Sequence, residues 1–229
     1  FGYDNTNAVN TRNLVNNSGV IAENATGAGT AKFANAGTGY GDDKAIFYGG
    51  RIASGTRLNE SNLVTNEGVV GTDVTGVGTS RGYLTGVRYG SSGQALFTKG
   101  NDANGGNVNI TNLVNNSGVI SADVTGVGTA RYGLAASTYG VGLAAIAYGS
   151  GGSSVKNLIN TSGVISSDVS GVGTGRADIA ASNYGGDKGI FAYGGNVVSL
   201  KNLLSNSGVI AADVTGVGTA RNGLGAAGY

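Results

Sequence analysis

Hydrophobic residues along the chain form short runs, and segments rich in Gly, Asn, Ser and Asp separate the runs. Residues 44–48 (Lys-Ala-Ile-Phe-Tyr) and 188–192 (Lys-Gly-Ile-Phe-Ala) are typical examples. Short runs rich in Val, Ile, Phe and Tyr, with turn residues on both sides, are typical of β-strands. No apolar stripe at helical spacing is long enough to predict a helix. The pattern therefore predicts an all-β protein.

The runs belong to a unit that occurs five times. Its most regular string is Asn-Leu-(Val/Ile/Leu), which begins at Asn13, Asn62, Asn112, Asn157 and Asn202, at intervals of 45 to 50 residues. A polar turn, an apolar pair and the segment Asp-Val-Thr-Gly-Val-Gly-Thr-Ala-Arg follow, the last with variations. Each unit then has a segment of small residues that ends in a tyrosine: Tyr40, Tyr89, Tyr139, Tyr184 or Tyr229.

Each unit contains four predicted strands. Strand a is the small-residue segment that ends in Tyr, strand b is the Ile-Phe run, strand c holds Asn-Leu-Val, and strand d holds the Val-Ile pair up to Asp. A tight turn such as 41–43 joins a to b, and an Asn-Ser-Gly turn joins c to d, where Gly can adopt a positive φ. Four short strands in 45–50 residues is the length of one β-propeller blade. The coils of a parallel β-solenoid, the alternative fold, are usually shorter.

The two ends of the chain predict how the ring closes. Tyr229 ends a strand a, whereas residues 1–3 match the end of a strand b. We therefore expect one domain over 1–229, a five-bladed β-propeller of four-stranded blades in which the C-terminal strand pairs with the N-terminal ones. We expect Val20-Ile21 and its equivalents on strand d, with Ile46-Phe47 and its equivalents on strand b, to form the core. Because the chain opens on Phe1 and part of one blade is missing, we also expect it to belong to a longer polypeptide with an unknown native number of blades.

The order of features within the unit resembles the kelch-type propeller repeat. That order is Arg, a small-residue strand, a tight turn, Ile-Phe ending in Gly-Gly (Gly49-Gly50, Gly194-Gly195), a variable loop, a strand, and an Asn-x-Ser/Gly turn. The resemblance implies a propeller topology, although Leu and Val stand where the family has its Tyr and Trp. The amino-acid sequence of the repeat is also similar to Gly-rich tandem repeats in structural proteins of phages and other viruses.

Composition excludes several classes of function. The 229 residues include 45 Gly and no His, Cys, Met, Trp or Pro. Without His and Cys there is no His-based triad, Cys-ligated zinc or disulfide framework. A net charge of +1 does not favour nucleic-acid binding, and no apolar run is long enough for a membrane helix. We therefore expect a protein that is not an enzyme and has no cofactor, catalytic or metal site; segments 4–7 and 101–104 offer oxygens to Ca²⁺ but fit no EF-hand loop.

The Gly-Val-Gly-Thr-Ala-Arg loop is predicted to be structural. A phosphate-binding loop requires a helix after it, whereas here a strand follows. An Arg side chain can bind a carboxylate and backbone carbonyls together, so we predict that the recurring Asp and Arg attach strand d to the next blade. These structural residues are Asp73, Arg81, Asp123, Arg131, Asp168, Arg176, Asp213 and Arg221. The tyrosines that end strand a are expected to pack between blades rather than to form sugar platforms.

The loop between strands b and c differs in every unit, while the strands around it hardly change. Variable loops of a repeat protein fall on one face, which is often the binding face. The candidate ligand-binding residues are Arg51, Arg57, Lys99, Asn101, Asp102 and Asn104. We predict a structural or adhesive module on a virion or cell surface that recognises a glycan or protein there. The alternative is a passive decoration or assembly protein that contacts neighbouring subunits of its own particle.

Overall fold

The computed structural model describes residues 1–228, and Tyr229, predicted to end the last strand a, lies outside them. These residues form eighteen β-strands and no helix, and every strand pair is antiparallel. The all-β prediction is confirmed.

Four sheets repeat the order a, b, c along the chain, and in two of them a short strand d is added. Their strands are β3 (Ala36–Tyr40), β4 (Lys44–Tyr48) and β5 (Ser61–Val64); β7 (Thr85–Tyr89), β8 (Gln94–Thr98), β10 (Ile110–Val114) and β11 (Val124–Thr125); β12 (Ala135–Tyr139), β13 (Leu143–Ala147) and β14 (Lys156–Ile159); and β15 (Ala180–Tyr184), β16 (Lys188–Ala192), β17 (Leu200–Leu204) and β18 (Val214–Thr215). Two short pairs complete the set: β1 (Gly2–Tyr3) with β2 (Ala8–Val9), and β6 (Arg81–Gly82) with β9 (Asn101–Asp102).

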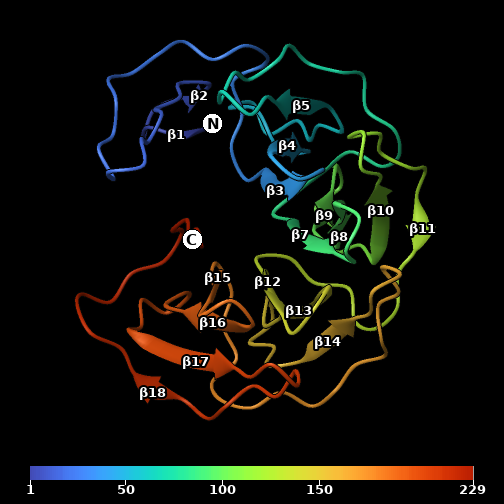
Figure 1. Cartoon of the computed structure of the whole chain (residues 1–229), viewed down its shortest axis with the longest axis vertical. Coiled ribbons are helices and arrows are strands. Elements are labelled where there is room, and N and C mark those ends of the chain that lie inside the picture. Colours follow the sequence, from blue (N-terminus) through green and yellow to red (C-terminus); the bar gives the residue numbers. More distant parts are fainter. Residues whose placement is uncertain (229) are drawn as a thin grey trace.

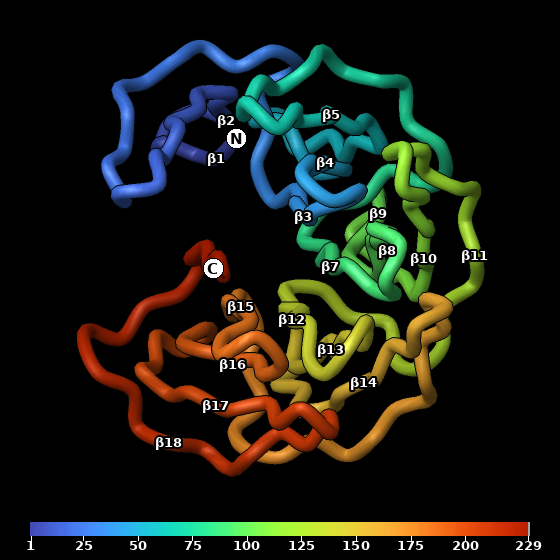
Figure 2. The backbone as a smooth tube through the Cα atoms, in the orientation of Figure 1, coloured from blue at the N-terminus to red at the C-terminus, as the bar shows by residue number. Residues whose placement is uncertain are grey.

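The sheets follow one another around a common centre, with β3, β7, β12 and β15 innermost (Figure 1). Each of these inner strands contacts the next one. Figure 2 shows that the N-terminal unit and the C-terminal segment lie on either side of an opening in this path. The predicted closure is not found: β1 and β2 pair only with each other, and 224–228 form no strand. This segment is almost entirely Gly and Ala, so it has little side-chain surface to hold it against a sheet.

The turn between strands c and d forms as its sequence predicts. The Asn160 side-chain Oδ1 accepts hydrogen bonds from the backbone N–H groups of Ser162 and Val164, both at 3.0 Å. Gly163 has a φ of +77° and donates its N–H to the Asn160 carbonyl oxygen. The turn that the Asn side chain stabilises places the residue three positions later in the left-handed region, where Gly is favoured.

Backbone hydrogen bonds connect each sheet to the next at both ends of the inner strands. Where the chain enters strand a, the N–H of Tyr83 donates to the carbonyl oxygen of Ala34, and Gly133 donates to Tyr83 in the same way. At the a–b turns, Gly41 donates to Gly93 at 2.7 Å. Since both kinds of bond recur at each following sheet, the sheets are locked together at both ends of their inner strands.

The hydrophobic core lies between neighbouring sheets in three clusters. On strand b, Ile46, Leu96, Phe97 and Phe191 are fully buried, whereas their predicted core neighbours Phe47 and Ile190 are only partly buried. The prediction for strand d is partly wrong, because Val20 and Ile21 are 60% and 66% exposed. In the last unit the pair is divided: Ile210 is 2% exposed and Val209 is 58% exposed. Strand d is the outermost strand, and alternate residues of a strand point to opposite faces, so one member of the pair faces solvent.

Three of the five tyrosines predicted to end strand a pack between sheets, as predicted, whereas Tyr184 is only partly buried. Tyr40, Tyr89 and Tyr139 are 3–5% exposed. Each lies beneath the c–d turn of the following sheet, where a Cβ added to the turn glycine would meet the ring. These side chains are therefore part of the packing and are not free to act as sugar platforms.

Candidate functional site

The predicted Asp and Arg residues belong to a polar network that recurs wherever the chain passes from one sheet into the next. Arg131 lies just before β12 and is 1% exposed. Its Nε donates to the Tyr148 carbonyl oxygen at 2.7 Å, and its Nη2 donates to Asn157 Oδ1 at 2.8 Å. Asp168, on the outer strand of the same sheet, lies 4.0 Å from this guanidinium. It also accepts a hydrogen bond from the Asn157 amide at 2.8 Å.

The structure pairs these residues differently from their order in the sequence. Asp73 and Arg81 stand eight residues apart, but Arg81 lies 3.8 Å from Asp123, and Asp73 lies 3.7 Å from Lys32. Arg176 likewise lies 3.9 Å from Asp213. Each cation therefore binds the Asp of the sheet it enters. Arg221 is exposed and has no Asp partner among residues 1–228; its guanidinium lies over the Tyr193 ring.

The central member of each network is an asparagine that sequence reasoning used only as a marker of the repeat. Asn62, Asn112, Asn157 and Asn202 have no exposed surface. Each amide joins the carboxylate to a backbone carbonyl of strand d, as Asn112 does with Asp123 and Ser121 at 2.9 and 3.0 Å. The sequence did carry a signal for this role, because Asn occupies this position in all five units. In the last three of these residues the arginine also donates to Oδ1, so the whole buried amide is satisfied, whereas Asn62 Oδ1 has no partner within residues 1–228.

Hydrogen bonding controls the charge of the network. Burial by itself would raise the pKa of Asp123, but hydrogen bonds from Asn112 and Thr79, together with the charge of Arg81, hold that pKa below its ordinary value. The Thr79 hydroxyl and backbone N–H donate to one carboxylate oxygen at 2.7 and 2.9 Å. The Gly-Val-Gly-Thr loop is therefore already occupied by a carboxylate of the protein itself, and this argues against a phosphate site.

Lys99, a predicted ligand-binding residue, lies away from the loop surface. Its side chain has no exposed surface, and Nζ donates to Asn109 Oδ1 at 2.7 Å and to the Val127 and Thr129 carbonyl oxygens at 3.1 Å. It occupies the position of Tyr148 and Tyr193 in the next two units, whose hydroxyls bond to the equivalent valine carbonyl. Lys99 therefore replaces a buried tyrosine of the repeat.

Lys99→Tyr is expected to raise the free energy of unfolding at pH 7 by about 1 kcal/mol, because it restores the repeat residue. Burial, and secondarily the charge of Arg131, lower the Lys99 pKa to about 8. The unfolded chain keeps the ordinary lysine pKa of about 10.4, so from pH 8 upward it binds more protons than the native state, and stability rises with pH. Urea titrations of both proteins between pH 7 and about pH 9.5 test this. A difference between them that does not change with pH would contradict it.

The other predicted residues of the b–c loops partly converge. Arg57 Nε donates to Asn101 Oδ1 at 3.1 Å, across two consecutive loops. Arg51 reaches the Tyr83 hydroxyl at 3.4 Å and pairs with Arg57 in a β-bridge. Asp102 instead organises its own loop by accepting the backbone N–H groups of two following residues. Asn104 is exposed at the tip of that loop.

Aromatic side chains that sequence reasoning missed lie beside these arginines. Arg51 stacks on Phe33 at 4.9 Å, Phe33 contacts Tyr3 at 4.9 Å, and Tyr83 contacts Tyr132 at 5.7 Å. Tyr3, Phe33 and Tyr83 also line a cavity of about 420 Å³ where the inner strands begin. Further cavities lie beside the middle and the end of these strands, and we call the space between the inner strands the central channel. The signal was an aromatic residue within two positions of the basic residue, as in Lys32-Phe33 and Arg131-Tyr132. We call Tyr3, Phe33, Tyr83, Tyr132, Arg51 and Arg57 the aromatic–arginine face.

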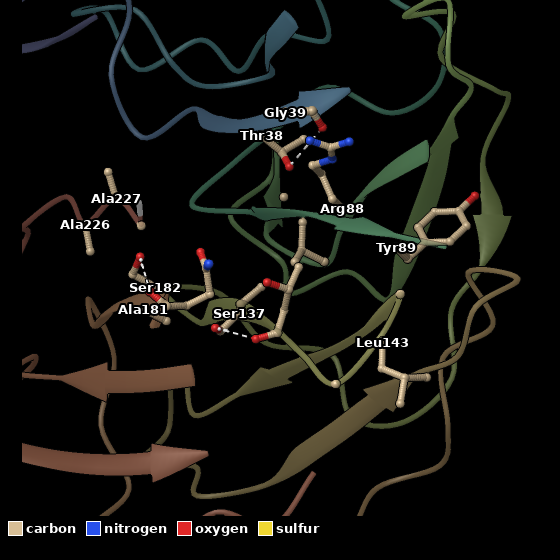
Figure 3. A pocket seen from close by; sticks show the side chains of 18 of the residues that line it. Thr38, Gly39, Arg88, Tyr89, Ser137, Leu143, Ala181, Ser182, Ala226 and Ala227 are labelled. Atoms are coloured by element: carbon tan, nitrogen blue, oxygen red, sulfur yellow. Dashed lines mark hydrogen bonds between the residues drawn. The ribbon is translucent and has the colours of Figure 1, made fainter. Parts of the chain in front are cut away.

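A larger cavity of about 500 Å³ opens at the opposite mouth, where the a–b turns lie (Figure 3). The inner strands β3, β7, β12 and β15, the a–b turns and residues 226–228 line it, mostly with Gly, Ala, Ser and Thr residues. Arg88 is the one charged side chain in its lining. The cavity is therefore a polar space with a single positive charge.

Residues 1–228 contain no cluster of three acidic side chains that could hold a metal ion. Within the same range, no helix is suited to cross a membrane. A comparison of the sequence with known protein families and with curated proteins found no match.

Proposed function

We propose that this protein is a non-enzymatic binding module, displayed on a virion or cell surface, that recognises a glycan through the aromatic–arginine face. The observation that carries the proposal is the convergence of aromatic and arginine side chains from consecutive units on one channel mouth. Ligand sites are concave surfaces in which a few polar groups fix the orientation of a ligand.

Partly exposed aromatic rings suit the apolar faces of sugar rings. Tyr3 is 51% exposed, and Phe33, Tyr83 and Tyr132 are partly exposed. Arg51 uses one Nη atom for the Tyr83 hydroxyl and its Nε is buried, so its second Nη atom remains for a sugar hydroxyl group. Surface display also agrees with a chain that has no oxidisable Cys or Met.

The architecture that we propose for this module is a five-bladed propeller of kelch-like topology, closed when residues 224–228 join the first unit as its strand a. The exposed Arg221 supports this proposal, because the equivalent arginines each bind within the sheet that they enter. In a closed ring, Arg221 would enter the sheet that contains Asn13 and Asn24.

A glycan array probed with the multivalent protein tests the function. We expect reproducible binding of neutral glycans that is reduced at least tenfold in Arg51→Ala/Tyr83→Ala, a loss of about 1.4 kcal/mol per site. Lys44→Ala, which alters an exposed lysine at the start of β4, serves as the matched control and should bind as the parent does. Binding that survives the double substitution, or a blank array, would overturn the proposal.

A second function, assembly into a particle of its own, is favoured by a belt of exposed valines on the outer rim. Three positions of the repeat contribute, with exposures of 42–86% in the last three units. Their members are Val119, Val124, Val127, Val164, Val169, Val172, Val209, Val214 and Val217. Extended apolar surface of this kind marks interaction sites. Concentration-dependent association that Val119→Thr/Val164→Thr/Val209→Thr abolishes would support assembly through this belt.

A further inference from the structure

We propose that the a–b mouth of the central channel is a second binding site, which takes a small carboxylate that also carries hydroxyl groups, with Arg88 as its anion-binding residue. This site lies at the opposite end of the channel from the aromatic–arginine face and does not depend on the function proposed there. Uronic acids are the simplest sugars with this chemistry.

The position just before the final tyrosine of strand a supplies the polar groups. Along β7 and β12, partly buried and buried residues alternate, so this position and the one two residues earlier face the channel. In successive sheets the position holds Gly39, Arg88, Thr138 and Asn183. All four line the same cavity, and Figure 3 shows Arg88 reaching across from β7 toward β3.

Arg88 is held in place but is not neutralised. One Nη atom donates to the Gly41 carbonyl oxygen, and the side-chain stem passes so close to Gly39 that an added Cβ would lie 3.0 Å from its Cδ. Within residues 1–228, no carboxylate lies within 4 Å of its guanidinium, in contrast to Arg81, Arg131 and Arg176. An unpaired guanidinium in a narrow channel attracts anions, and its fork matches a carboxylate.

The neighbouring side chains offer partners for hydroxyl groups. Ser137 and Ser182 donate their hydroxyls to the carbonyls of Thr138 and Asn183. The side chains of Thr138 and Asn183 themselves form no hydrogen bond with any other part of 1–228, so they are available to a ligand. The rest of the lining is mostly Gly and Ala, which leaves room for a molecule of monosaccharide size.

The repeat itself distinguishes this position from the scaffold. The position two residues earlier is Gly or Ala in every unit (Gly37, Gly86, Ala136, Ala181, Ala226), and the tyrosine that follows is constant. Roles that every repeat shares call for the same residue in each repeat. A change from Gly to Arg, Thr and Asn at one channel-facing position instead builds an asymmetric set of groups, which a single bound molecule can use.

Calorimetry and two-dimensional NMR with D-glucuronate test the proposal. We expect glucuronate to bind at least tenfold more tightly than D-glucose, which lacks the charge, and than acetate, which lacks the hydroxyls. The backbone signals of Arg88, Thr138 and Asn183 should shift, and those of Tyr83 and Tyr132 should not. Arg88→Gln should weaken binding at least tenfold, Arg88→Lys less, and Lys201→Gln on β17, outside both proposed sites, should have no effect.

Three results would overturn the site: no glucuronate binding by the parent protein, equal binding of glucose, or unchanged binding by Arg88→Gln. Shifts confined to the aromatic–arginine face would also contradict it, while leaving the proposed glycan function intact. If Arg88→Gln fails to fold, the Arg88→Lys variant and the NMR shifts of the parent protein still decide the question.

Discussion

Arg131→Met is expected to lower the free energy of unfolding by about 3–5 kcal/mol, the cost of leaving buried polar partners unpaired. The guanidinium is 1% exposed and binds the Tyr148 carbonyl oxygen and Asn157 Oδ1. Methionine fills a similar volume but donates no hydrogen bond, so both acceptors lose their partner and Asp168 loses its counter-charge. Urea denaturation followed by circular dichroism measures the change.

Arg221→Met is the matched control, because it changes the same position of the repeat in an exposed setting. Within residues 1–228, the Arg221 side chain donates only to the Thr219 carbonyl oxygen at 3.5 Å and stacks on Tyr193 at 4.1 Å. An exposed cation–π contact contributes about 0.5–1 kcal/mol, so the expected loss is no larger. Equal losses in the two variants would show that the network around Arg131 adds nothing to stability.

Gly76→Ala is expected to cost about 3 kcal/mol or more, enough to prevent folding of a marginally stable chain. Gly76 begins the Gly-Val-Gly-Thr loop, and a Cβ at this position would overlap the Asn59 carbonyl oxygen. Backbone cannot move aside as a flexible side chain can, so the loop would have to leave its sheet. Thermal unfolding of the purified variant measures the effect.

Gly225→Ala provides the comparison for the glycine effect. Its Cβ would meet no atom within 4 Å, and its backbone is not in the left-handed region. We expect a change within about 0.5 kcal/mol, as for ordinary surface substitutions. A Gly76→Ala variant as stable as Gly225→Ala would contradict the close approach of the loop to residue 59.

The fold could be predicted from sequence to the extent that it is local. The runs around Ile46 and Phe191 and the turn at Gly163 depend on residues next to them in the chain, and they form where the pattern places them. Strand d could not be assigned as reliably. It bonds to strand c at few points, such as Val64 with Val70, and its valines face solvent.

The sites were harder to predict because they depend on which unit faces which. Asp73 is the acidic residue closest to Arg81 along the sequence. However, the chain leaves the sheet of Asp73 before it reaches Arg81, which enters the next sheet and pairs there with Asp123. The aromatic–arginine face likewise assembles residues from several units, and no spacing within one unit reveals it. Repetition identified the scaffold well, and only the positions that break the repeat, such as Lys99 and Arg88, distinguish one unit from another.

The direction of the polar network has a consequence for synthesis on the ribosome. Arg131 leaves the ribosome first, whereas Asn157, which satisfies it, follows 26 residues later. A nascent sheet therefore keeps an open, hydrated arginine until its third strand emerges, and only then can that arginine be buried. We therefore expect the sheets to fold one at a time from the N-terminus, with each new sheet packing against one that has already folded.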